Sequence, residues 1–279
     1  MDNRKFILTG VMGMPITQSR SPILHNHWIA QHGLRGAYGH FPVEEKNLEA
    51  AMRGLSALGL AGCNVTQPHK VEALKLMDVV DPLAQRMGAV NCVVVQSDGS
   101  LHGFNHDGYG YIQSLRDVNP DWRADAGPIV VLGAGGASRA MVLSLIDQGA
   151  TEIRLVNRTL DKAQALAAGY EQIVKVVAWA ERNTAMEGCA LLVNTTNQGM
   201  YGQPPLDVTL DALPQSAMVS DAIYIPLETP LLQTARLRGN QTINGLGMLL
   251  NQARPAFKSW FGVMPEITDE LTQAVLATF

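Results

Sequence analysis

Residues 128–138 read Pro-Ile-Val-Val-Leu-Gly-Ala-Gly-Gly-Ala-Ser, an apolar run that leads directly into a glycine-rich segment. The apolar run predicts a buried strand. Residues 139–148 are good helix formers and are followed by Gly149, so they predict a helix that ends there. Residues 152–156, Glu-Ile-Arg-Leu-Val, predict a second strand. Strand, glycine-rich turn, helix and strand within about 30 residues are typical of a βαβ unit.

Outward from this unit, strand-like and helix-like stretches alternate along most of the chain, which indicates an α/β fold. Further strands are predicted at 191–193 and 218–220, and the polar stretch 117–126 is typical of a boundary loop. From about Leu246 the apolar residues recur at helical spacing. We therefore expect one α/β domain of residues 1–106, completed by returning helices at 245–279. Residues 107–244 would form a second, Rossmann-type domain around the βαβ unit.

Composition excludes several classes of protein. The chain has 279 residues and a formal net charge of −4, so nothing favours binding to nucleic acid. No stretch of about 18 consecutive apolar residues predicts a membrane span, and the N-terminus lacks the pattern of a signal peptide. Three widely spaced cysteines predict neither a disulfide framework nor a metal site, and the histidine spacings match no zinc motif. We expect a cytoplasmic monomer or homodimer without a metal.

The glycine-rich turn has the context that a dinucleotide site requires, with a strand before it and a helix after it. Gly133 permits the tight turn, and Gly135 lets the backbone approach a pyrophosphate at the helix N-terminus. Ser138 replaces the third glycine of the usual fingerprint and is small enough for close helix packing. The alternative is a tight turn that binds nothing. The predicted cofactor segment comprises Gly133, Ala134, Gly135, Gly136 and Ala137.

The end of the second strand bears on the choice of cofactor. An NAD site usually has Asp or Glu there to hold the ribose 2′-hydroxyl. This chain has Asn157, Arg158 and Thr159, with Lys162 a little further on. A planar guanidinium can bind a 2′-phosphate with two parallel N–H hydrogen bonds. We expect NADP, with NAD possible; the alternative is that Arg158 and Lys162 are solvated surface charges.

Two residues suit the chemistry of an alcohol. Lys70 follows a predicted short strand that ends near Asn64, and ligands bind at such strand ends in α/β sheets. Asp107 follows Asn105-His106 and precedes Gly108, which is also an ordinary turn signal. When a hydride leaves a carbinol carbon, the hydroxyl proton passes to a base. Lysine can serve as that base and aspartate can orient both groups.

Taken in order, the motifs of this chain resemble those of the shikimate dehydrogenase family over nearly its whole length. Several motifs in register are far more specific than the glycine-rich turn alone. The N-terminal half contributes Ser19-Arg-Ser-Pro22 with His25-Asn26, Asn64-Val-Thr-x-Pro-x-Lys70, Gly88-Ala-Val-Asn91 and Asn105-x-Asp107. The C-terminal half contributes Gly133–Ala137, Asn157–Thr159, Asn194-x-Thr196, Gly199-Met200, Asp221-Ala-Ile-Tyr224 and Gly245-x-Gly-Met248 to Gln252.

The resemblance implies a role for each position. Ser19 and Ser21 would bind the substrate carboxylate, and Lys70 with Asp107 would be the catalytic pair. Ring hydroxyls would be held by Thr66, Asn91 and Gln252, while Tyr224 would border the substrate near the nicotinamide. Thr196 and Gly245 belong to segments that would contact the cofactor. The implied fold has two α/β domains. Residues 1–106 and 245–279 would be the substrate-binding domain, to which the last helices return, and residues 107–244 the dinucleotide-binding domain.

For some of these residues a structural role is the alternative. Ser19 and Ser21 suit a helix start before Pro22, Asn91 suits a turn, and Gln252 suits a polar helix position. The chain also departs from the family pattern. Gln18 stands where the family commonly has His, and His106 stands where it commonly has Thr.

The predicted activity is reversible hydride transfer between shikimate and NADP. The alternatives are a quinate/shikimate dehydrogenase that uses NAD, and a paralogue that acts on a related hydroxy acid. A dinucleotide sensor without catalysis is a further alternative, but it would need neither Lys70 nor Asp107.

Overall fold

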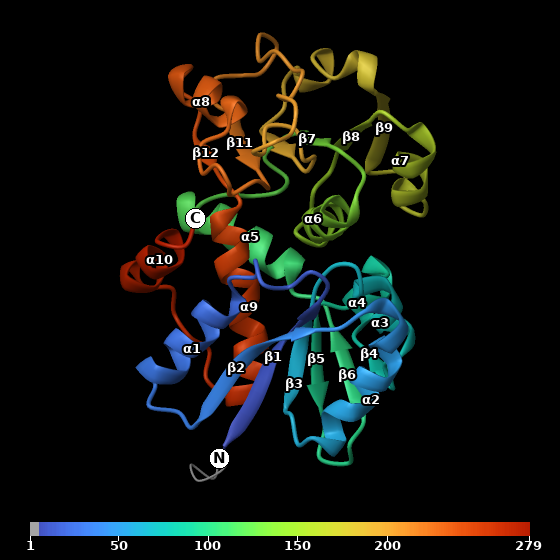
Figure 1. Cartoon of the computed structure of the whole chain (residues 1–279). Helices are drawn as coiled ribbons and strands as arrows, with labels where there is room; N and C mark the ends of the chain where they lie inside the picture. Colours follow the sequence, from blue (N-terminus) through green and yellow to red (C-terminus); the bar gives the residue numbers. More distant parts are fainter. Residues whose placement is uncertain (1–5) are drawn as a thin grey trace. The chain divides into compact units, whose positions relative to one another are not determined.

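The computed structural model describes residues 6–279 (Figure 1). The chain folds into two compact units. One unit runs as far as His106 and includes Leu250–Phe279, and the other comprises Asp107–Leu249. Among residues 6–279, no helix combines the length and the apolar character needed to cross a bilayer.

The first unit is built on a mixed sheet. Its strands are β1 (Ile7–Gly13), β2 (Gly36–Pro42), β3 (Gly62–Val65), β4 (Val79–Val80), β5 (Cys92–Val95) and β6 (Leu101–Phe104). Their order is β2-β1-β3-β5-β6-β4. Strands β2, β1 and β3 are mutually parallel, whereas β5 runs antiparallel to both β3 and β6. The end of β3, the start of β5 and the end of β6 therefore lie at one edge of the sheet.

Helices cover both faces of this sheet. They are α1 (Ser21–Gln31), α2 (Leu48–Ala57), α3 (Lys70–Lys75), α4 (Pro82–Met87) and α10 (Asp269–Leu276), with a short 3₁₀ helix at Glu45–Asn47. Alternation along the strands sends Cys63 and Val65 into a core with Leu48, Met52 and Ala73, which come from α2 and α3.

The opposite face of the sheet carries an aromatic cluster. His25 and Trp28 of α1 contact Phe257 of helix α9 (Leu246–Phe261), and Tyr38 of β2 lies against Trp260 of the same helix. The Trp260 indole donates a hydrogen bond of 3.1 Å to the carbonyl of Val93 in β5. These contacts explain why the C-terminal part of α9 belongs to the first unit.

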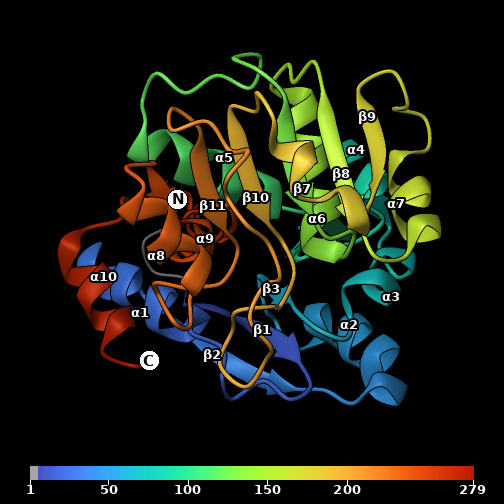
Figure 2. The same ribbon diagram turned by 90° about the horizontal axis from the view of Figure 1, so that it is seen from above.

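The second unit is a parallel six-stranded sheet. Its strands are β7 (Ile129–Leu132), β8 (Ile153–Asn157), β9 (Val174–Ala178), β10 (Leu191–Asn194), β11 (Met218–Asp221) and β12 (Thr242–Ile243). Their order is β12-β11-β10-β7-β8-β9, so the chain changes direction across the sheet between β7 and β10. Figure 2 shows β11, β10, β7, β8 and β9 side by side in this order. This is the Rossmann-type arrangement, in which ligands bind at the switch point.

Both faces of the second sheet are buried, as the apolar strand sequences predict. Ile129 and Val131 pack against Leu115 and Met141, whereas Val130 and Leu132 pack against Leu232 on the other face. The helices and 3₁₀ segments of the unit are α5 (Asp107–Val118), α6 (Gly136–Asp147), α7 (Leu160–Ala167), α8 (Pro230–Leu237), Trp179–Glu181 and Thr184–Met186.

Two boundaries, at the glycine-rich turn and at the domain junction, differ from those that the sequence predicts. Helix α6 begins at Gly136, three residues before the expected start at Arg139, because the tight turn is complete at Gly135. Residues 117–126, expected as a boundary loop, lie inside the second unit after most of α5.

The second unit also extends to Leu249 instead of ending at residue 244. Gly245 donates a backbone hydrogen bond to Ile223, a Cβ on Gly247 would lie 2.9 Å from the Ser114 side chain, and Met248 packs against the apolar core of the unit. The beginning of α9 therefore belongs to the second unit.

Candidate functional site

In the first unit, the motif segments meet at the edge where β3 and β6 end and β5 begins. Val65 of β3 donates a backbone hydrogen bond to the carbonyl of Asn91, and Asn91 donates one to the carbonyl of Phe104 in β6. Three segments that lie far apart in the sequence are thereby held side by side. The antiparallel course of β5 brings Asn91 to this edge.

Lys70 is the first residue of α3 and is half-buried. Its carbonyl accepts a hydrogen bond of 2.9 Å from Val90, which ties the lysine motif to the segment that carries Asn91. The preceding His69 is buried, and its Nε2 lies 2.7 Å from the carbonyl of Val43. Thr66 donates a backbone hydrogen bond to Met12 in β1. The backbone around Lys70 is therefore fixed from three neighbouring segments.

Asn91 is buried, and its side chain organises the next segment. Its Oδ1 accepts a hydrogen bond of 2.9 Å from the backbone of His106, and the Asn105 amide donates one of 2.9 Å to Ala89. The His106 ring stacks on Phe104 with centroids 5.9 Å apart. The half-buried Asp107 follows at once and begins α5, in the second unit. Asn91 thus has the turn role that the sequence offers as an alternative, and it also lies where the motif segments meet.

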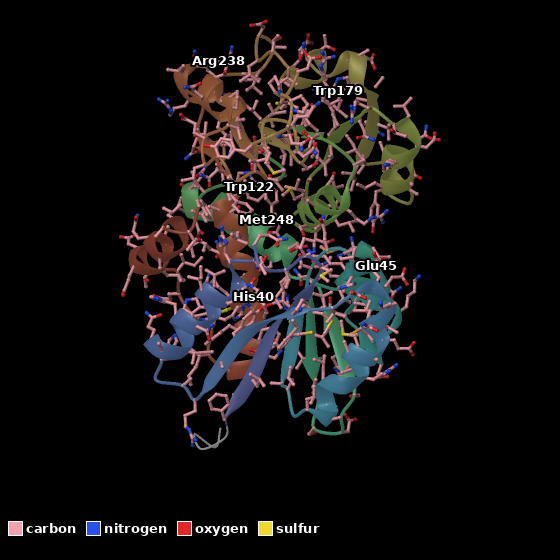
Figure 3. The ribbon with its side chains drawn as sticks, viewed as in Figure 1. His40, Glu45, Trp122, Trp179, Arg238 and Met248 are labelled. Carbon is pink, nitrogen blue, oxygen red and sulfur yellow. The ribbon has the colours of Figure 1, made fainter. Side chains whose placement is uncertain are left out.

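The two serines of the N-terminal motif lie next to each other. The Ser19 hydroxyl donates to that of Ser21 at 3.3 Å, and its oxygen accepts from the Ser21 backbone at 3.4 Å. The N-cap of α1 is Arg20, whose side chain makes no capping hydrogen bond. Because Ser19 accepts from the backbone of Ser21, the first residue of α1, the serine pair lies at the helix start that the alternative role describes. Nε2 of His40, labelled in Figure 3, lies 3.1 Å from the Ser19 carbonyl.

Gln252 is half-buried on α9, within the part of the helix that belongs to the first unit. Its neighbour Asn251 is fully buried and accepts a hydrogen bond from Arg254, which in turn donates to the carbonyl of Pro265. Gln252 itself occupies a polar position on a helix, which is the structural role that the sequence offers as an alternative.

In the second unit, the glycine-rich turn lies at the switch point between β7 and β10. Gly133 has φ +105°, and a Cβ there would lie 2.7 Å from Oγ1 of Thr195, which follows β10. Ser138 is fully buried and donates a hydrogen bond of 2.7 Å to the Gly133 carbonyl. Ser138 thus fits the close packing expected of the third position and also closes the turn.

The glycines further along the turn have a different reason to be glycine. In the part of the chain that the structure describes, a Cβ on Gly135 or Gly136 would have no atom within 4 Å apart from those of the adjacent residues and of the helix's own backbone. Gly135, Gly136 and Ala137 are exposed at the N-terminus of α6, whereas Ala134 packs against the apolar core. The bare backbone leaves room beside amides that can donate to an anion. These residues fit a dinucleotide pyrophosphate.

The segment at the end of β8, residues 157–159, has no carboxylate in its sequence. The side chain of Asn157 donates a hydrogen bond of 2.7 Å to the carbonyl of Thr159, the residue that precedes α7. Arg158 is exposed, and so is Lys162 in the first turn of α7. An exposed guanidinium at this strand end suits a 2′-phosphate, although Asp161 adds a carboxylate in the same helical turn.

A buried polar network joins the ends of β10 and β11. Asn194 accepts from the backbone and the hydroxyl of Thr196, at 3.0 and 2.8 Å, and donates to Asp221 at 3.0 Å. Asp221 also accepts from the Thr229 hydroxyl at 2.7 Å and from the Ile223 backbone at 3.1 Å. Burial raises the pKa of Asp221 to about 6. The network holds Thr196 and the turn that leads to Tyr224.

Tyr224 and Gly245 flank this network within the second unit. Tyr224 is half-buried in the segment after β11. Gly245 packs so closely that a Cβ would lie 2.1 Å from the carbonyl of Ala222. Backbone packing therefore requires glycine at position 245 whether or not a cofactor is present.

Sequence reasoning missed Asn64, Tyr38, Asn194 and Asp221 as separate contributors to the site. Asn64, Asn194 and Asp221 open motifs that the family resemblance contains, so the resemblance offered a signal for them. Tyr38 lies in no motif, and its connection to Asn64 spans 26 residues of sequence. Nothing local in the sequence predicts that contact.

Comparison with known proteins agrees with this arrangement. Three family models match: the shikimate dehydrogenase substrate binding domain at residues 11–93, shikimate / quinate 5-dehydrogenase at 121–201, and the shikimate 5′-dehydrogenase C-terminal domain at 245–276. The shikimate dehydrogenase (NADP(+)) of Paramagnetospirillum magneticum is 51% identical over 97% of this chain and 98% of its own length.

Two solved structures have the same fold. Shikimate 5-dehydrogenase from Thermus thermophilus, in complex with NADP(H) and shikimate, has a TM-score of 0.86 and 32% identity, covering 98% of this chain and all of the other. Quinate dehydrogenase from Corynebacterium glutamicum, in complex with NAD, has a TM-score of 0.90 and 28% identity, again covering 98% of this chain and all of the other.

The fold and the two sets of motif residues define a dinucleotide-dependent oxidoreductase that acts on a hydroxyl group. The chain belongs to the shikimate dehydrogenase family.

Proposed function

We propose that this protein is an NADP-dependent shikimate dehydrogenase, which interconverts shikimate and 3-dehydroshikimate. The observation that carries the proposal is the meeting of the lysine, Asn91 and Asn105 segments at one edge of the first sheet. Relatives about half identical over the full chain bear the same name. Bound NADP supplies a nicotinamide that takes up hydride from the carbinol carbon.

The catalytic pair in this proposal is Lys70 with Asp107. As the C–H electron pair leaves with the hydride, the O–H bond breaks and its proton passes to the base at this centre. Lys70 acts as that base and Asp107 orients the hydroxyl and the amine. In the reverse direction the same groups return the proton to the carbonyl oxygen.

The proposed substrate contacts are polar side chains of the motif segments. Ser19 and Ser21 bind the carboxylate, since two adjacent hydroxyls can both donate to it. The ring hydroxyls are held by Thr66, Asn91 and Gln252, with Tyr224 bordering the ring. Binding the carboxylate at one end and the hydroxyls at the other presents one carbinol carbon for reaction.

The proposed cofactor contacts lie at the ends of β7, β8 and β10. Amides of the turn at Gly133–Ala137 bind the pyrophosphate, and Thr196 with Gly245 borders the nicotinamide side. Arg158 binds the 2′-phosphate, with Lys162 adding positive charge and Asn157–Thr159 shaping the strand end.

An absorbance assay for nicotinamide reduction tests the proposal directly. Shikimate added to the protein with NADP should produce reduced cofactor at a rate proportional to enzyme concentration, and Lys70→Ala should abolish most of it. A folded wild-type protein that reduces no NADP with shikimate would contradict the proposal.

A second candidate activity is oxidation of quinate with NAD. The observation in its favour is the fold of the quinate dehydrogenase that was solved with NAD, which this chain matches over nearly its whole length. The exposed Arg158 favours NADP over this alternative.

We also infer that the protein works in a reducing compartment such as the cytoplasm, as a monomer or a homodimer. All three cysteines, Cys63, Cys92 and Cys189, are free and buried. Burial raises the pKa of the Cys63 thiol to about 12 and that of Cys189 to about 11. Such thiols are inert and act as packing groups.

A further inference from the structure

Tyr38 lies at the centre of a buried polar path in the first unit. Its hydroxyl donates a hydrogen bond of 2.7 Å to Oδ1 of Asn64, and Asn64 donates one of 3.0 Å to the carbonyl of Asn91. The Asn91 side chain in turn accepts from the backbone of His106. The Tyr38 hydroxyl is thus the first link of a chain that leads to the proposed ring-hydroxyl contacts.

The same hydroxyl also reaches the other end of the proposed substrate site. Burial raises the pKa of Tyr38 well above its usual value, and a hydrogen bond with the Ser21 side chain opposes part of that rise. The phenol therefore keeps its proton and can donate to Asn64 at any ordinary pH. Ser21 is itself within 3.3 Å of the Ser19 hydroxyl. One side chain thus links the serine pair to the Asn64–Asn91 pair.

Two residues of helix α1 hold Tyr38 in place. Strand β2, which carries Tyr38, is an outermost strand of its sheet and has a neighbouring strand on one side only. The Asn26 side chain makes two hydrogen bonds with the backbone of Tyr38. It accepts from the N–H at 2.9 Å and donates to the carbonyl at 2.9 Å. The His25 ring stacks on the Tyr38 ring with centroids 4.1 Å apart and planes 3° apart.

The environment of His25 suits this supporting role. Burial lowers its pKa to about 3, so the ring is neutral and brings no charge beside the phenol. His25 and Asn26 belong to the N-terminal motif, and both contact Tyr38. His25 stacks on its ring and Asn26 holds its backbone.

We propose that Tyr38 is a positioning residue, which sets the spacing between the Ser19–Ser21 end and the Asn64–Asn91 end of the substrate site. The inference rests on the proposed function, because those two ends are assigned to substrate there. A positioning role of this kind predicts an effect on shikimate and none on the dinucleotide, whose proposed contacts lie in the other unit.

The test compares Tyr38→Phe with Trp28→Phe. Tyr38→Phe keeps the stacked ring and loses only the hydroxyl. Trp28→Phe also removes one hydrogen bond in the same aromatic cluster, the partly buried one from the indole to the Glu266 carbonyl, but that bond lies outside the polar path. KM for shikimate, KM for NADP, kcat and the melting temperature are measured for each protein.

Tyr38→Phe should raise KM for shikimate about tenfold, which is the loss expected when a buried hydrogen-bonding partner is removed, with KM for NADP within about twofold of wild type. Trp28→Phe should lower the melting temperature and leave KM for shikimate unchanged. Asn26→Ala removes both side-chain hydrogen bonds to the backbone of Tyr38 while leaving the Tyr38 hydroxyl in place. This variant should raise KM for shikimate about threefold. It provides the test if Tyr38→Phe does not fold.

An unchanged KM for shikimate in folded Tyr38→Phe would overturn the positioning role, whatever the melting temperature. Equal rises in KM for both substrates, or an equal effect of Trp28→Phe, would also overturn it, since each indicates a structural role only. If wild-type protein does not turn over shikimate, the proposed function fails first and the inference fails with it.

Discussion

The Asn194 amide donates a 3.0 Å hydrogen bond to the Asp221 carboxylate and so joins the carboxyl ends of two adjacent buried strands. Both residues are at most 1% exposed. Asp221 accepts from three partners, and Asn194 directs its own oxygen to Thr196. A buried carboxylate thereby supports the segment that is proposed to face the nicotinamide.

Asp221 should make stability depend on pH. Burial raises its pKa in the folded protein to about 6, from an ordinary value of 3.8. The folded protein therefore binds this proton more tightly than the unfolded chain. The stabilisation from that proton is complete below about pH 4 and is lost as the pH rises through about 6.

The variant Asp221→Asn mimics the protonated form and should lack this loss. The free energy of unfolding of this variant should increase relative to that of wild type by about 3 kcal/mol between pH 4 and pH 7. This figure follows from the rise in the pKa of Asp221, at about 1.36 kcal/mol for each pKa unit. Urea unfolding of both proteins across that range measures the difference. Parallel curves for the two proteins would show that Asp221 has an ordinary pKa.

Lys70→Ala should lower kcat for shikimate oxidation by about a hundredfold or more, because the base is lost, while KM changes less. Lys75→Ala is the matched control. Lys75 ends the same short helix, is exposed, and forms an ion pair with Glu72. Steady-state rates for both variants are compared with wild type. Near-normal turnover in folded Lys70→Ala would remove the lysine from the reacting centre.

Arg158→Ala should weaken NADP binding about tenfold or more and leave NAD binding within about twofold, because only NADP has a 2′-phosphate for the guanidinium. Arg123→Ala is the control. Arg123 is exposed, pairs with Asp125 and precedes the amino end of β7. Titration calorimetry with both cofactors measures the effect. Equal weakening of the two cofactors would exclude a role that depends on the phosphate.

His106→Thr should change the preference between shikimate and quinate by about tenfold, near 1.4 kcal/mol in transition-state binding. The imidazole is bulkier than the threonine side chain that the family commonly has, and its backbone is fixed by Asn91. The ratio of the two kcat/KM values is measured before and after the change. His102→Thr, on the preceding strand β6, controls for loss of a histidine. If the ratio stays constant, His106 does not contact the substrate.

Much of the fold follows from local pattern. The apolar run at 129–132, the glycine-rich turn and the second run at 153–157 predict the central βαβ unit, because a strand buried on both faces needs a continuous apolar sequence. The α/β class and the Rossmann-type second sheet are confirmed. The predicted start of α6 is wrong by three residues, since the sequence does not show where a tight turn closes.

The candidate site likewise has one part that the sequence predicts and another part that it does not. Lys70, Asn91 and Asn105 can be found from their motifs, and their meeting at one edge follows from strand direction. The contacts of Tyr38 with Asn64 and of Asn194 with Asp221 join residues about 26 positions apart. Neither pair is periodic, so only the folded chain brings them together. The end of the second unit at Leu249 likewise depends on packing between Gly245 and Ala222, which no local pattern shows.

The most direct test of the central claim is a set of four kcat/KM values for the wild-type protein, with shikimate or quinate as substrate and NADP or NAD as cofactor. The structure predicts the highest value for shikimate with NADP, by about tenfold or more over each of the other three pairs. A highest value for quinate with NAD would contradict the account and would make the quinate dehydrogenase alternative the better description of this chain.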